Sequence, residues 1–409
     1  MRRLQIIALT VVLGVFFASC SKKSNPVSGS STPDESNGRI SIYNDEAYLS
    51  ADVTSLNDSI PIDPVSLGKS SAFHGFSLRL VSEIKPPKVN GQQVQATSVS
   101  LNGSYAYISY NMRGDQYTGA IEVVNLGNGN PKVVSRATFK DTDVNSITYF
   151  NNEVCMAEAT GDVAYNPPAI AEVLDLNNGK LDLKRDIRSQ LASYAATSVT
   201  DGNGNIYVTT GSTGGLYTLT QDSLKVRSYV QLADARWVAL SSQYLVVVQG
   251  GGNLSTFDPY SGSLLKTYSF AGTNIPESKS TVRIMGGKAL IAAGDGGVQL
   301  MNLADGKSVG SIPRTIVPGL DSSVTVTNAV DGSGQYIFIS NGEAGVYAAQ
   351  ASQSLDNLSG DSAIALTVVG KLRFGTQESV NHVAFDGSTL VVASGLGGVK
   401  IVRFFAGTP

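Results

Sequence analysis

The hydrophobic positions of this chain alternate with polar ones in short runs, which recur from about residue 94 to the C-terminus. Alternation with a period of two is the pattern of a half-buried β-strand, and no useful length of this region has the 3.6-residue period of an amphipathic helix. Runs rich in Val, Ile and Tyr, such as residues 105–109 and 120–124, are separated by turns rich in Gly, Asn and Asp. The pattern predicts an all-β fold.

The expected strands group into a repeated unit. Each copy has a short first strand, two central apolar strands and a more polar fourth strand. Seven copies can be counted from the first-strand positions that we take as equivalent: Val99, Ile147, Val199, Val238, Val282, Asn328 and Val383. These positions are separated by 39 to 55 residues. Four short strands per unit of this length are typical of a propeller blade, so we predict a seven-bladed β-propeller.

The two ends of the repeats indicate how the ring closes. The seventh copy ends after its third strand, near Phe405, and therefore lacks an outer strand. The run 77–84 precedes the first copy and is similar to the fourth strands of the other copies. We expect this N-terminal strand to complete the seventh blade, so that no unpaired edge is left there. Residues 71–409 would then form one domain.

The first twenty residues have the pattern of a bacterial signal peptide. Two arginines precede an apolar run over residues 6–17, which is too short to span a bilayer comfortably. The sequence Phe-Ala-Ser-Cys at residues 17–20 resembles the lipobox of bacterial lipoproteins, with Phe17 in place of the usual Leu. This resemblance implies removal of residues 1–19, lipidation of Cys20 (palmitate among the acyl chains) and attachment to the cell envelope at the outer membrane. An ordinary secretory signal with an incidental cysteine is the alternative.

Residues 20–70 are predicted to be the lipidated cysteine followed by a flexible tether. Residues 21–37 are rich in Ser, Gly, Pro and Asp and show no periodic apolar pattern. Residues 40–67 are slightly more apolar but contain Pro61 and Pro64, and this part could lie along the surface of the domain. Because no helix-length apolar segment follows, acyl chains would provide the membrane contact, and several chains hold a protein stably where one does not.

Several copies carry glycine directly before the third strand, where tight hairpins need positive φ values. The unit Gly-Gly-(Leu/Val)-x-(Leu/Ile/Thr)-(Val/Met/Phe)-(Asp/Asn) resembles the LVIVD-repeat family of extracytoplasmic propellers. The match is clearest at residues 297–302, Gly-Val-Gln-Leu-Met-Asn, and degenerate elsewhere. The resemblance implies a propeller outside the cytoplasm, and it implies no particular reaction because the family is not tied to one.

Composition limits the partners and cofactors. The chain has 409 residues, 33 acidic and 30 basic side chains and a net charge of −3, whereas a nucleic-acid partner would demand a basic face. Two Cys and two His leave little material for a zinc or haem site, and one Trp is too few for a quinone-cofactor propeller. We therefore expect no nucleic acid and no cofactor. If Cys20 carries lipid, Cys155 is the remaining thiol, and its strand-like surroundings predict a buried core residue.

Catalytic motifs are not evident, since the chain contains no nucleophile elbow and no P-loop. A metal-dependent hydrolase propeller would hold an ion over the channel with acidic residues, for which Asp143, Asp234, Glu277 and Glu378 are the candidates. They do not occupy equivalent positions of the repeat, so we interpret them as loop carboxylates and predict no metal site. The sequence favours a non-catalytic protein and leaves an enzyme open.

Candidate binding residues come from two places in the repeats. Trp237 and His382 share one first-strand position, where we align small or hydroxyl residues in the other copies. If this position faces the channel, Arg236 and Asn381 would complete a polar and aromatic corner, because Trp and Arg are frequent binding anchors. The alternative is that Trp237 and His382 only fill space between blades.

The loops between second and third strands are long in the first two copies, at residues 111–118 and 160–168. Elaborated loops on a rigid scaffold often carry recognition, which adds Arg113, Tyr117 and Tyr165 as candidates. We expect these loops at the channel mouth where the first strands begin. The function expected from the sequence is a lipid-anchored envelope propeller that binds a protein, a glycan or a small ligand. A metal-dependent hydrolase with a site at the channel mouth and a structural envelope subunit are the alternatives.

Overall fold

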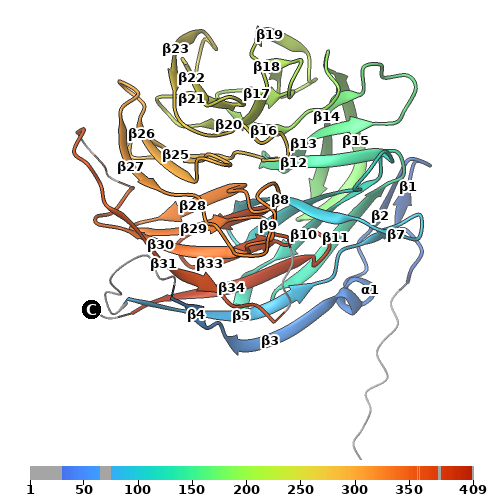
Figure 1. The fold of residues 1–409 in the computed structure, drawn as a ribbon. Coiled ribbons are helices and arrows are strands. Elements are labelled where there is room, and N and C mark those ends of the chain that lie inside the picture. The colour runs from blue at the N-terminus through green and yellow to red at the C-terminus, as the bar shows by residue number, and fades with distance from the viewer. Residues whose placement is uncertain (1–29, 65–74, 357, 359, 376–378, 408–409) are drawn as a thin grey trace, which may run out of the picture.

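Seven β-sheets follow one another around a central axis (Figure 1). This computed structural model describes residues 30–64, 75–356, 358, 360–375 and 379–407. Each sheet is one blade, its strands are antiparallel, and the first strand of each blade lies nearest the axis. The predicted all-β, seven-bladed propeller is therefore confirmed. Among the residues that the structure describes, no helix is both long and apolar enough to cross a membrane.

The strands of the blades match the repeated units. Blades 1 to 4 comprise β8 (Gln95–Asn102), β9 (Tyr105–Asn111), β10 (Gly119–Asn125) and β11 (Lys132–Phe139); β12 (Thr142–Phe150), β13 (Glu153–Thr160), β14 (Ala169–Asn177) and β15 (Lys180–Gln190); β16 (Ser198–Gly202), β17 (Asn205–Thr209), β18 (Gly215–Thr220) and β19 (Val226–Gln231); and β20 (Ala235–Leu240), β21 (Leu245–Gln249), β22 (Asn253–Phe257) and β23 (Leu264–Ser269). Blades 5 to 7 comprise β24 (Val282–Met285), β25 (Lys288–Ala292), β26 (Val298–Asn302) and β27 (Ser308–Ile312); β28 (Ala329–Ser333), β29 (Tyr336–Ser340), β30 (Val346–Ala351) and β31 (Leu366–Leu372); and β32 (His382–Phe385), β33 (Thr389–Ala393) and β34 (Val399–Ala406). A short hairpin, β6 (Lys88–Val89) with β7 (Gln92–Gln93), precedes blade 1.

The ring is closed by an N-terminal strand, as predicted. Strand β5 (Phe76–Ile84) pairs antiparallel with β34 along its whole length, from Ile84 opposite Val399 to Phe76 opposite Ala406. Gly398, just before β34, has a φ of +73°, and a Cβ at this position would lie 2.0 Å from the backbone oxygen of Ile84. Glycine is therefore required where the two ends of the propeller meet.

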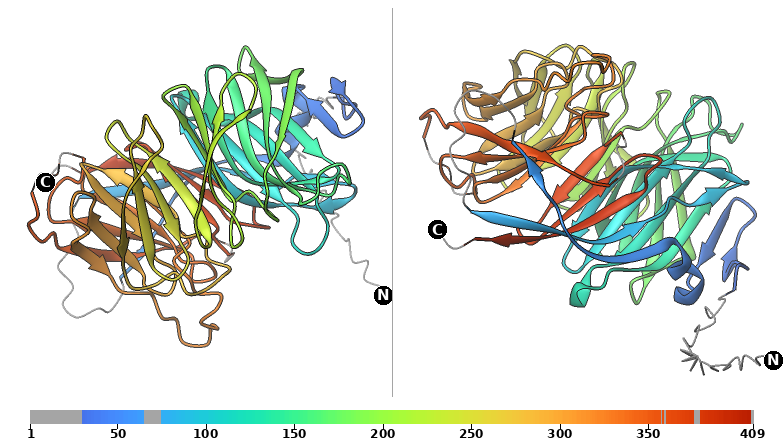
Figure 2. Two further views of the ribbon diagram at one scale, coloured as in Figure 1. Left: turned by 90° about the horizontal axis from the view of Figure 1, so that it is seen from above. Right: turned by 60° about the horizontal axis from the view of Figure 1, so that its bottom comes forward.

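Residues 34–63 differ from the flexible tether that we expect from the sequence. Strands β1 (Glu35–Ser36) and β2 (Ile40–Tyr43) extend blade 1, β3 (Val53–Ser59) extends blade 7 and β4 (Ile62–Asp63) extends blade 6. The short helices α1 (Glu46–Leu49) and η1 (Ser50–Asp52) join β2 to β3, and Figure 2 shows this blue segment along the outside of the ring. The segment is ordered because its few apolar side chains, among them Ile40, Ile42 and Leu49, are fully buried against the blades.

The blades are joined near the start of their first strands by a closed series of hydrogen bonds, which we call the inter-blade belt. In each blade a polar side chain donates to a backbone carbonyl at the start of the next blade, at 2.8 to 3.4 Å. In blade order the donors are Thr97, Asn145, Thr197, Arg236, Ser278, Asn328 and Asn381. The last donor binds the carbonyl of Ala96 in blade 1, so the belt has no end.

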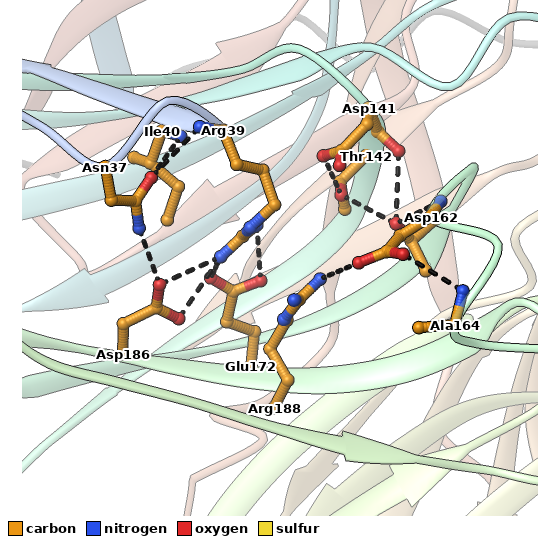
Figure 3. A network of polar contacts seen from close by, with 11 residues as sticks. Asn37, Arg39, Ile40, Asp141, Thr142, Asp162, Ala164, Glu172, Asp186 and Arg188 are labelled. Atoms are coloured by element: carbon orange, nitrogen blue, oxygen red, sulfur yellow. Dashed lines mark hydrogen bonds and ion pairs between the residues drawn. The ribbon is translucent and has the colours of Figure 1, made fainter.

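Buried charges connect the N-terminal segment to blade 2 (Figure 3). Arg39, between β1 and β2, donates to both carboxylate oxygens of Glu172 at 2.5 and 3.0 Å and also contacts Asp186. Glu158 on the neighbouring strand is fully buried, and neither of its carboxylate oxygens has a hydrogen-bond partner in the described part of the chain. Burial raises the pKa of Glu158 well above 4.5, and the negative charge of Glu172 raises it further. Both effects favour the protonated form of Glu158 in the folded protein.

The protonation of Glu158 predicts a pH-dependent stability. Above its unfolded pKa of about 4.3, folding takes up a proton here, so wild-type stability falls as pH rises by up to about 1.4 kcal/mol per pH unit. Glu158→Gln, which is neutral at every pH, should match the wild type near pH 4 and be more stable at pH 8. Thermal unfolding at both pH values measures this.

A second substitution on the same network provides the control. Glu172→Gln removes the charged partner of Arg39 and leaves a poorly compensated buried cation, so it should destabilise the protein at pH 8. Burial raises the pKa of Glu172 to about 7, so the loss should be smaller near pH 4. If Glu158→Gln is destabilised at pH 8 as much as Glu172→Gln, the protonation assigned to Glu158 is wrong.

Candidate ligand site in the central channel

The first strands converge on a channel that encloses a cavity of about 310 Å³. Aliphatic side chains from all seven blades line it at one level: Val99, Ile147, Val199, Val238, Val282, Val330 and Val383. In blade 6 the structural equivalent is thus Val330 and not Asn328, which belongs to the inter-blade belt. The prediction that Asn328 is equivalent to the aliphatic residues of the other copies is therefore wrong by two residues. The polar run before the first strand of blade 6 resembles the runs before the first strands of the other blades. Most of the lining side chains on either side of the aliphatic level are polar, among them Ser98, Ser146 and Thr200.

Trp237 and His382 meet across the channel. They belong to blades 4 and 7, which lie on opposite sides of the ring, and their rings stack with centroids 5.2 Å apart and planes at 28°. A second contact also crosses the channel, since the Lys279 ammonium from blade 5 donates to the backbone oxygen of Asn145 in blade 2 at 3.3 Å. The two contacts lie at the end where the first strands begin. From the stacked rings the cavity extends toward the other end of the first strands.

His382 is held in its neutral form. Its side chain is buried, with 7% of the residue exposed, and Nδ1 has no hydrogen-bond partner in the described part of the chain. Burial lowers the pKa of His382 to about 3, and the nearby charge of Lys279 lowers it further. Burial also lowers the pKa of Lys279, to about 8. At neutral pH the channel therefore contains an uncharged imidazole near a charged ammonium.

The far end of the cavity carries charged side chains. Arg283 contacts Asp331, with Nε 3.4 Å from Oδ1. Asp331 also accepts hydrogen bonds from the backbone N–H groups of Gly332 and Phe385, both at 2.8 Å, while burial raises its pKa. Asp386 accepts from the N–H groups of the turn that follows it. Arg283 and Asp331 were not among the residues singled out from the sequence, although both stand one position after the aliphatic residue of their strand.

Arg236 and Asn381 lie away from the cavity. The Arg236 guanidinium is buried between blades 4 and 5, where it pairs with Asp234 at 2.6 Å and donates to the backbone oxygens of Ile275 and Ser278. Asn381 donates to the Ala96 oxygen as the last member of the inter-blade belt. Of the four residues expected in one polar and aromatic corner, the structure brings Trp237 and His382 together. The Arg236 side chain points away from the cavity because the carboxylate and carbonyl groups that pair with its charge lie between blades 4 and 5.

The two long loops lie together on the rim. The Tyr117 ring of the first loop lies 3.1 Å from where a Cβ of Gly161 in the second loop would be. The Arg188 guanidinium lies 4.5 Å from the centre of the Tyr165 ring and also pairs with Asp162. Arg113 is exposed on its loop. None of Arg113, Tyr117 and Tyr165 lines the cavity, which extends from the Trp237–His382 stack away from these loops.

The acidic residues considered for a metal site are spread apart. Asp143 accepts from the backbone N–H groups of Met112 and Thr118, and burial raises its pKa to about 6. Asp234 pairs with Arg236, Glu277 is exposed, and Glu378 lies outside the described residues. Within the described ranges no group of three or more His, Cys, Asp and Glu side chains is arranged to hold a metal ion.

The structure describes one of the two cysteines for which the sequence makes a prediction. Cys155 is a fully buried free thiol on β13, in agreement with the core position expected from its surroundings, and burial raises its pKa well above 9. Cys20, the predicted lipidation site, lies outside the described residues.

Comparisons with known proteins identify no family for this chain. No protein-family model matches the chain, and no curated protein matches it. Among solved structures, the chain is similar to the crystal structure of the computationally designed Ika8 protein, with 15% sequence identity and a TM-score of 0.49 over 85% of this chain and 98% of that chain. The molecule is a seven-bladed β-propeller, an architecture that commonly serves as a binding or interaction module.

The Trp237–His382 contact predicts a measurable pKa change. Trp237→Ala should admit water to the imidazole and raise the pKa of His382 from about 3 by more than about one unit, toward its ordinary value of 6.5. A pH titration of the His382 ring by NMR measures this. Trp237→Phe keeps an aromatic ring over the imidazole and should change the pKa less. A value that stays near 3 in folded Trp237→Ala would show that the indole does not shield His382.

Proposed function

We propose that this protein is a lipid-anchored β-propeller of the bacterial cell envelope that binds a small ligand in its central channel. The observation that carries the binding role is the cavity beside the Trp237–His382 stack. Its volume of about 310 Å³ lies at the small end of the range of ligand pockets. A concave site with a few buried polar groups on a rigid scaffold is the usual form of a small-molecule site.

The anchor rests on the lipobox-like residues 17–20 and on the expected compartment of LVIVD-like repeats. The folded part begins close to the proposed lipid. The N–H of Ser30 donates to Asp45 at 2.7 Å, and only nine residues separate Ser30 from Cys20. Even fully extended, such a linker reaches about 35 Å. In the proposed protein the edge of blade 1 would therefore stay near the membrane surface.

Other uses of the propeller have less support. Of the acidic candidates for a metal-dependent hydrolase that the structure describes, Asp143 accepts from loop N–H groups, Asp234 pairs with Arg236 and Glu277 is exposed. A structural envelope subunit would need no cavity with buried polar groups. These observations favour ligand binding over both alternatives.

The anchor can be tested with one substitution. Cys20→Ser in the full chain should abolish lipid attachment and release nearly all of the protein from the membrane fraction, because acyl chains are the proposed anchor. Metabolic labelling with palmitate and fractionation after a high-salt wash measure this. Cys155→Ala changes the other cysteine and should leave the protein lipidated. Retention of Cys20→Ser in washed membranes would contradict the proposal.

The binding role can be tested without knowing the ligand. A broad panel of small metabolites and sugars, screened by ligand-observed NMR against the full chain, should yield a compound that Trp237→Ala binds about thirtyfold more weakly, which is about 2 kcal/mol. Arg113→Ala on the rim is the control and should retain affinity. If no compound binds, or if the binders are unaffected by Trp237→Ala, the channel is not the binding site.

A further inference from the structure

Three polar groups beside the cavity have unused hydrogen-bonding capacity. Ser98 and Ser146 are each 1% exposed and line the cavity, and within the described chain their hydroxyls form no hydrogen bond. His382 lines the same cavity, and its Nδ1 is without a partner. Buried polar groups are nearly always satisfied in proteins, because leaving one unpaired is costly. The hydroxyls of Ser98 and Ser146 are open to the cavity, so water or a ligand there would be their hydrogen-bonding partner.

These groups lie on one side of the channel. His382, Ser98 and Ser146 belong to blades 7, 1 and 2, which are consecutive in the closed ring, and occupy the same position of their first strands. Next to them, the aliphatic level provides an apolar wall from all seven blades. A matching ligand has several hydrogen-bonding groups on one side and C–H groups that can contact the aliphatic wall.

The charges around the cavity disfavour a charged ligand of either sign. Asp331 and Asp386 at the far end are balanced by Arg283 at the same end and Lys279 beyond the stacked rings, so a charged ligand would lose its hydration without finding an uncompensated partner of opposite charge. His382 adds no charge at neutral pH, since burial keeps its imidazole unprotonated. The hydroxyls of Ser98, Ser146, Ser100 and Thr200 make the lining too polar for a purely apolar molecule.

The volume sets the size of the ligand. At about 30 Å³ per molecule, 310 Å³ holds about ten waters, which is more than the unpaired groups require. We infer that the cavity binds a neutral polyhydroxylated molecule of the size of a monosaccharide, with the hydroxyls of Ser98 and Ser146 as its hydrogen-bonding partners. This inference rests on the proposed binding function and specifies its ligand class.

The experiment compares sugars that differ in charge. Saturation-transfer NMR at pH 6, on the full chain in a detergent without sugar groups, would test glucose, galactose and mannose beside glucose 6-phosphate and glucosamine. At least one neutral hexose should bind, with an affinity in the high-micromolar to millimolar range that suits so small a ligand. The phosphate and the amine on the same scaffold should bind at least tenfold more weakly.

Matched serine variants test the assigned partners. Ser98→Ala combined with Ser146→Ala should weaken hexose binding at least tenfold. Ser198→Ala alters the same position in blade 3, where the hydroxyl already accepts from the Val238 N–H, and should stay within twofold of the wild type. Thermal unfolding verifies that each variant folds. Equal losses in both variants would overturn the assignment of Ser98 and Ser146.

The remaining outcomes separate this inference from the proposed function. Charged analogues that bind as well as glucose would overturn the neutral ligand class. If no hexose binds while another compound of the broad panel binds through Trp237, the ligand class is wrong and the binding function stands. If nothing binds, waters alone occupy the cavity and both proposals fail.

Discussion

Closure of the ring is the constraint on which the rest of the molecule depends. A four-stranded blade has two apolar faces and must pack both against neighbours, so an open ring would expose the outer faces of its two end blades. Two devices close this ring: β5 pairs with β34 to join the chain ends within blade 7, and the inter-blade belt runs through all seven blades without a gap. Both depend on contacts between residues that are distant in sequence.

The N-terminal segment reinforces the part of the ring where closure occurs. Its strands extend blades 1, 6 and 7, and its charged residues reach buried partners, Arg39 with Glu172 and Asp52 with Arg136. Buried ion pairs add little net stability, because desolvation offsets much of their attraction. These ion pairs instead favour one position of the N-terminal segment on the ring, because any other position would leave Glu172 or Arg136 buried with fewer partners.

The same closure creates the channel site. Seven first strands converge on one axis, and Trp237 fits there because serine, threonine or alanine occupies the corresponding position in five other blades. Its ring stacks on His382 from the opposite side, which keeps the imidazole dry and neutral. Small side chains elsewhere at this level leave the cavity open and place the hydroxyls of Ser98 and Ser146 beside it. Packing around the axis and the proposed ligand contacts therefore come from the same residues.

Local patterns in the sequence determined the strands, the seven repeats and the closing strand, because alternation and turn residues act over a few positions. They also brought Trp237 and His382 to one position of the repeat. Only the tertiary structure decided that these rings stack, that Arg236 and Asn381 join blades, and that Val330 replaces Asn328 in the aliphatic level. It also decided that residues 34–63 are ordered, because short edge strands without strong apolar periodicity gain their stability from the blades they extend. Each of these features depends on contacts between residues that are distant in sequence, and such contacts cannot be read from a local sequence pattern.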